Sequence, residues 1–139
     1  MKVSLSLIDG VHFAAETGSG HRILLDGSPE IGGQNLGARP MEMVLVGLAG
    51  CTALDVISIL RKARQTVSDC RIEIEAERAD TVPRVFSRIH LQFRVFGNNL
   101  KASVVERAIK LSLEKYCSVT MMLNKTAEIS HAYELIETS

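Results

Sequence analysis

Residues 40–62 form a long apolar stretch, PMEMVLVGLAGCTALDVISILRK. It is too long for a single strand, lacks an internal turn signal and is rich in Leu, Met and Ala, so it predicts one helix that begins at Pro40. A helix that is apolar on almost all sides is expected to be buried. Because Glu42 and Asp55 interrupt the stretch, we do not expect it to span a membrane.

Length and composition indicate one domain covering residues 1–139. The chain has 46% hydrophobic residues, enough for its own core, and no break in composition. Its formal net charge is zero and it contains no basic run, which argues against a nucleic-acid partner. The first ten residues lack the apolar core of a secretory signal, so we expect a cytoplasmic protein.

Alternating patterns predict strands on both sides of the long helix. Three strands at residues 2–8, 11–17 and 21–25 are expected to form a meander, with a tight turn at Asp9 and Gly10. The segment between Asp26 and Pro40 contains four glycines and few apolar residues. It is long for a simple connection, and we expect it to act as a mobile lid.

The second half of the chain predicts a hairpin, a helix and a closing strand. Residues 70–78 and 86–96 alternate as strands and are expected to pair antiparallel. Apolar residues at helical spacing follow in residues 100–116, and residues 127–136 alternate again. The fold class is therefore α+β, with antiparallel sheet packed on one long buried hydrophobic helix.

The three cysteines, Cys51, Cys70 and Cys117, are the candidates for chemistry. An odd number at wide spacing does not indicate a disulfide framework, and a pair of them is more typical of a catalytic or redox site. The sequence has no CxxC or HxxxH motif, so we expect neither a metal nor a cofactor. Cys70 opens a predicted strand and is expected to be structural. A buried packing role is the alternative for Cys51.

Cys51 and Cys117 would have the logic of a thiol peroxidase if the fold brings them together. A thiolate attacks a peroxide, becomes a sulfenic acid and condenses with the second thiol. A guanidinium must favour the thiolate, and the candidates are Arg22 and Arg39, although an ordinary surface role is the more common one for such an arginine. Asp55, one helical turn from Cys51, would oppose the thiolate. A histidine beside Cys51 would instead make a hydrolase or acyl-transfer nucleophile.

Several segments together resemble the OsmC/Ohr family of osmotically inducible and organic hydroperoxide resistance proteins. The segments are Pro40-Met41-Glu42, Ala49-Gly50-Cys51, PRVFSRIHLQFRV at 83–95 and EKYCSV at 114–119. Their order and spacing match over nearly the whole chain. The resemblance implies an OsmC-like fold in an intertwined homodimer, with the cysteine helices buried at its centre and active sites at the subunit interface.

The resemblance also implies an activity, the reduction of organic hydroperoxides. Cys51 would be the peroxidatic thiol and Cys117 the resolving thiol, recharged by a dithiol or a lipoylated protein. The family site also contains an Arg, here Arg22 or Arg39, and a Glu directly after the proline. In this sequence that Glu is displaced by one residue to Glu42, about 100° around a helix. The alternative is a non-peroxidatic member that binds a small apolar or thiol ligand at the dimer interface.

Overall fold

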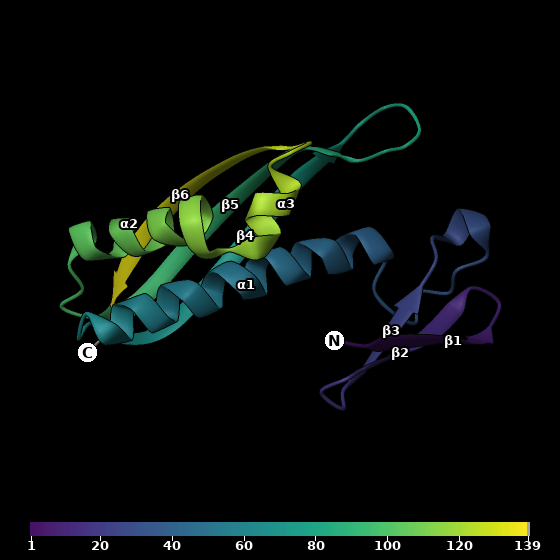
Figure 1. Ribbon diagram of the computed structural model, residues 1–139, viewed down its shortest axis with the longest axis horizontal. Coiled ribbons are helices and arrows are strands. Elements are labelled where there is room, and N and C mark those ends of the chain that lie inside the picture. The colour runs from purple at the N-terminus through teal and green to yellow at the C-terminus, as the bar shows by residue number, and fades with distance from the viewer. Residues whose placement is uncertain (139) are drawn as a thin grey trace. The chain divides into compact units, whose positions relative to one another are not determined.

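The computed structural model describes residues 1–138, which divide into two compact units, residues 1–46 and residues 47 onward. Each unit contains a three-stranded sheet (Figure 1). In the first unit, the sheet has the order β1-β2-β3, with β1 at Val3–Asp9, β2 at His12–Thr17 and β3 at Arg22–Asp26. All its pairs are antiparallel, which confirms the predicted meander. Gly10, at φ +49°, forms the turn between β1 and β2.

The connection after β3 is organised around the buried side chain of Asp26. Its carboxylate accepts backbone N–H bonds from Gly27 (2.8 Å), Gln34 (3.0 Å) and Leu36 (3.1 Å). Within this connection, Pro29–Ile31 form a single 3₁₀ turn, η1. The bonds, led by the one from Leu36, lower the pKa of Asp26 below its usual value. The segment therefore has a defined anchor, and its action as a lid stays a prediction.

The long helix α1 spans Pro40–Lys62, as the sequence predicts. At its start, the Glu42 carboxylate accepts the backbone N–H of Arg39 at 2.8 Å, half of a capping box. The helix begins in the first unit and ends in the second. By length and apolar composition alone it would suffice to cross a membrane.

The expected burial of α1 on almost all sides is wrong for the single chain. One strip at four-residue spacing is buried, consisting of Leu48, Thr52, Val56 and Leu60. Most other positions are half-buried or exposed, and the Leu54 side chain is 74% exposed. The physical reason is that the core of the second unit covers only one side of the helix. Residues at spacing i, i+4 lie on the same side of a helix, so only that strip is buried.

The sheet of the second unit has the order β4-β5-β6, with β4 at Thr66–Arg78, β5 at Phe86–Asn98 and β6 at Glu128–Glu137. β4 and β5 form the predicted antiparallel hairpin. β6 pairs with β5 in parallel, which corrects the expectation of a purely antiparallel sheet. The helical crossover after β5 returns the chain to the beginning of that strand, where Glu128 pairs with Arg88, so the new strand must run the same way.

The crossover contains three helical pieces instead of one predicted helix. They are α2 (Ala102–Leu111), the π-helical turn η2 (Ser112–Tyr116) and α3 (Ser118–Leu123). The predicted helix over 100–116 therefore changes its winding at residue 112. The six residues of α3 were missed because one and a half turns are too short to show a helical period.

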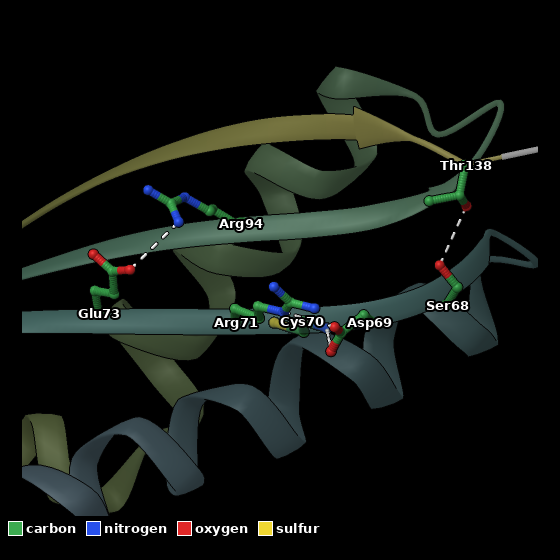
Figure 2. A network of polar contacts seen from close by, with 7 residues as sticks. All are labelled: Ser68, Asp69, Cys70, Arg71, Glu73, Arg94 and Thr138. Carbon is green, nitrogen blue, oxygen red and sulfur yellow. Dashed lines mark hydrogen bonds and ion pairs between the residues drawn. The ribbon is translucent and has the colours of Figure 1, made fainter.

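The core of the second unit lies between its sheet and its helices. Alternate residues of β5 are buried, namely Ile89, Leu91, Phe93 and Val95. In Figure 1, α2 and the later part of α1 lie on one face of this sheet. The opposite face is polar: Arg94 pairs with Glu73 at 3.3 Å (Figure 2) and with Glu134 at 2.8 Å. Exposed pairs of this kind stabilise a fold by about 1 kcal/mol or less.

Candidate functional site

Two of the three cysteines meet in the second unit, next to an aspartate. One ligand-type atom from each of Cys51, Asp55 and Cys117 lies within 4.8 Å of the other two. Cys51 and Asp55 are one turn apart on α1 and so share a helical face. Cys117 reaches them from the junction between η2 and α3. The sequence could place Asp55 beside Cys51, but the approach of Cys117 depends on how the two helical segments pack.

The change of winding at η2 sets the position of Cys117. The backbone N–H of Cys117 donates to the Ser112 carbonyl at 2.8 Å and closes the wide π-helical turn. Cys117 itself is extended, with φ −75° and ψ 105°, and caps α3. Its sulfur accepts the backbone N–H of Thr120 at 3.4 Å. The thiol is therefore fixed by backbone geometry on both sides.

A chain of hydroxyl groups fixes the aspartate. The Ser112 hydroxyl donates to Asp55 Oδ2 at 2.9 Å, and the Thr52 hydroxyl lies 2.7 Å from that of Ser112. The Thr52 and Ser112 side chains are fully buried. Because Ser112 donates to Asp55, Thr52 is the donor to Ser112. This chain joins α1 to η2 and orients the carboxylate. Thr52 and Ser112 were not among the predicted site residues, since isolated hydroxyl residues give no signal by spacing.

The three thiols lie in different environments. Cys117 is fully buried, and burial is the main reason why its pKa is raised; hydrogen bonds from Thr120 oppose this effect and the neighbouring Cys51 thiol adds to it. Cys51 is half-buried. Cys70 lies within β4, and burial, aided by Asp69, raises its pKa to about 11. Figure 2 shows Cys70 between Asp69 and Arg71. A thiol with so high a pKa is mostly protonated and unreactive near neutral pH.

The remaining predicted site residues belong to the first unit. Arg22 is exposed at the start of β3. The Arg39 guanidinium donates to Asn35 Oδ1 at 3.3 Å and to the Gly37 carbonyl at 3.1 Å, and Glu42 accepts the backbone N–H of Arg39. The structure thus gives Arg39 and Glu42 local contacts around the start of α1.

Within residues 47–138, histidine is absent from the cysteine cluster. His90 lies 2.8 Å from the Ser130 hydroxyl, and His131 makes an edge contact with Phe93. These contacts give no support to a Cys51 and His nucleophile in the second unit.

A surface groove begins beside Asp55. It has a volume of about 460 Å³ and is lined by Asp55, Ser58, Ile59, Lys62, Leu111 and Tyr116. One side comes from α1 and the other from α2 and η2. The groove provides a mixed polar and apolar surface next to the half-buried edge of the thiol cluster.

Comparison with known proteins identifies the family. Residues 32–132 match the family model described as OsmC-like protein. The chain belongs to the OsmC family. A relative, Protein YhfA of Escherichia coli (strain K12), is 45% identical over 136 residues, which cover 98% of each chain.

Solved structures share the OsmC-like fold of this chain. A hypothetical protein from Aquifex aeolicus has a TM-score of 0.87 at 30% identity, covering 99% of this chain and 97% of that one. An organic hydroperoxide resistance protein OsmC from Legionella pneumophila has a TM-score of 0.69 at 15% identity, covering 96% and 97%. At this low identity, the similarity to the Legionella protein shows a shared fold alone.

Proposed function

We propose that this protein is a thiol-dependent peroxidase that reduces organic hydroperoxides. The observation that carries the proposal is that Cys51 and Cys117, from distant parts of the sequence, have sulfurs within 4.8 Å of each other. Membership of the OsmC family and a fold shared with an organic hydroperoxide resistance protein support this class of reaction.

Different burial of the two thiols gives them different roles. Half-buried Cys51 attacks the peroxide as a thiolate, the O–O bond breaks, and the alcohol leaves after taking up a proton. Buried Cys117 then attacks the Cys51 sulfenic acid; an S–S bond forms and water leaves. A small or lipoylated dithiol reduces this disulfide by exchange and becomes a disulfide itself. Arg22 and Arg39 are our candidates for the guanidinium that favours the thiolate, with Glu42 as their acidic companion.

We also propose that the protein is a cytoplasmic homodimer. The apolar residues of α1 that its own chain leaves exposed, such as Leu54, support burial against a second copy. Sedimentation equilibrium should give twice the mass of one chain, and Leu54→Glu should shift the protein toward the monomer. A wild-type monomer at micromolar concentration would contradict the dimer.

A second candidate function is supported by the charge at the site. The Asp55 carboxylate lies beside the two thiols and disfavours a neighbouring thiolate. The groove next to it offers space for a small ligand. The alternative is therefore a non-peroxidatic protein that binds an apolar or thiol-bearing ligand at the dimer interface.

The deciding experiment measures the consumption of tert-butyl and fatty-acid hydroperoxides by the protein, with a dithiol as reductant and a metal chelator present. Cys51→Ser should abolish turnover. Cys117→Ser should still form one sulfenic acid per chain, but it should form no disulfide and should not turn over. The matched control is Cys70→Ser, which should keep wild-type turnover because the Cys70 thiol lies outside the cluster. Equal, slow consumption by wild type and Cys51→Ser would contradict the peroxidase and favour the ligand-binding alternative.

A further inference from the structure

We propose that Cys51, Asp55 and Cys117 bind one thiophilic divalent cation of the Zn²⁺ class. The three residues supply two sulfurs and a carboxylate, which are typical zinc ligands. The inference goes beyond the peroxidase and does not depend on it. It also reverses the expectation from sequence, where the absence of a CxxC motif argued against a metal.

The distances suit a metal site after a small adjustment. Zinc binds sulfur at about 2.3 Å and carboxylate oxygen at about 2.0–2.2 Å, so ligand atoms of a tetrahedral site lie about 3.5–3.8 Å apart. The three atoms here are within 4.8 Å of one another. Side-chain movements of about 1 Å would therefore bring them onto one ion.

A bound cation would explain why the cluster combines two thiols with a carboxylate. A carboxylate beside two thiols opposes their ionisation, but a cation bound by all three reverses this effect. Each thiol loses its proton to solvent as its sulfur binds, so one ion displaces two protons. Two thiolates and one carboxylate then offset the double positive charge. Among residues 47–138, Asp55 has no ion pair with a lysine or arginine within 4 Å.

Neighbouring donors already orient two of the three ligands. Ser112 donates to Asp55 Oδ2 and leaves Oδ1 for a metal, while the Thr120 N–H donates to the Cys117 sulfur. Such outer hydrogen bonds are a regular part of metal sites because they fix ligand orientation. The Thr120 hydroxyl is also buried near this sulfur without a hydrogen bond of ordinary geometry. Three protein ligands leave the fourth position for water.

A metal and a disulfide would exclude one another at this site. Both use the sulfurs of Cys51 and Cys117, and a sulfur in a disulfide has no thiolate to offer. Metal binding therefore keeps the pair reduced, and oxidation of the pair expels the ion. Oxidised wild type therefore provides a further test without a substitution, because protein with a verified Cys51–Cys117 disulfide lacks both thiolate ligands.

In the test, reduced and chelator-treated protein is titrated with Co²⁺ as a spectroscopic probe. The affinity for Zn²⁺ is then measured by competition against a chromophoric chelator. Wild type should bind one ion per chain with a thiolate-to-cobalt charge-transfer band, which Zn²⁺ displaces. Cys51→Ser and Cys117→Ser should lose the band or weaken binding, and Asp55→Asn should weaken Zn²⁺ affinity at least about 10-fold. Cys70→Ser is the matched control and should bind as wild type does.

Circular dichroism of each variant establishes that it is folded. Wild-type affinity retained in Asp55→Asn, or in oxidised protein whose Cys51–Cys117 disulfide is verified by mass spectrometry, would overturn the proposed ligand set, as would loss of the band in Cys70→Ser. Absence of the band from reduced wild type would overturn metal binding as such. Because the peroxidase assay contains chelator and the metal titration contains no peroxide, either proposal can fail without the other.

Discussion

Two aspartates, one in each unit, show how the same side chain is used in different ways. Asp26 is buried and accepts three backbone N–H bonds from the connection that follows β3. Asp55 is half-buried and accepts the Ser112 hydroxyl, and one of its carboxylate oxygens lies within 4.8 Å of the sulfurs of Cys51 and Cys117. The Asp26 carboxylate thus uses three of its about four acceptor sites on backbone N–H groups, whereas the Asp55 carboxylate retains more capacity to bind.

The difference separates a structural charge from a reactive one. Backbone donors hold the Asp26 carboxylate in its ionised form and tie a glycine-rich segment to the end of β3. At Asp55, a hydroxyl chain that ends on Oδ2 fixes the position of the carboxylate beside the sulfurs. An acidic residue with unused acceptor capacity beside nucleophiles is thus the better indicator of a functional site.

Loss of the Asp26 anchor at low pH should release the whole connection after β3. Because the pKa of Asp26 is lowered in the folded protein, its contribution to stability is complete above the usual value of about 3.9 and is lost as the pH falls through the lower folded pKa. Amide NMR signals of Gln34 and Leu36 should move together with a midpoint below 3.9. Asp26→Asn should lack this transition. A midpoint above 3.9 in wild type would contradict the anchoring role.

Removal of the hydroxyl that joins α1 to η2 should have the next largest effect. Ser112→Ala leaves the buried Thr52 hydroxyl without its acceptor and Asp55 without its donor, so the free energy of unfolding should fall by about 1–3 kcal/mol. Urea unfolding at a fixed protein concentration measures it. Ser58→Ala, at an exposed position of α1, is the control and should change stability by about 0.5 kcal/mol or less. Equal values for the two variants would show that the hydroxyl chain contributes nothing.

Patterns within one element predicted the fold well, and contacts between elements account for what was missed. The bounds of α1 and the hairpin of β4 and β5 follow from local periodicity. The parallel direction of β6 depends on where the crossover returns, which no local pattern records. Burial of α1 was overestimated because an apolar sequence does not reveal which molecule covers it.

The candidate site was predictable only in part, because it too depends on contacts between elements. Cys51 and Cys117 were selected from chemistry and from the family resemblance, but their closeness depends on the π-helical turn η2. The turn has no sequence signature, because its residues continue the helical period of α2. Asp55 was recognised as a neighbour of Cys51, whereas its link to Ser112 joins residues from separate helices.

Asp55→Asn, the counterpart of Asp26→Asn, should change stability less than either substitution above. In Asp55→Asn, the amide oxygen can still accept the Ser112 hydroxyl, so the free energy of unfolding measured with chelator present should change by less than about 1 kcal/mol. At Asp26 the same change introduces amide hydrogens where three backbone N–H groups need acceptors. Urea unfolding of the two variants side by side should therefore give the greater loss for Asp26→Asn. If Asp55→Asn were instead destabilised more than Ser112→Ala, the Asp55 charge itself would be structural, and the distinction between the two aspartates would fail.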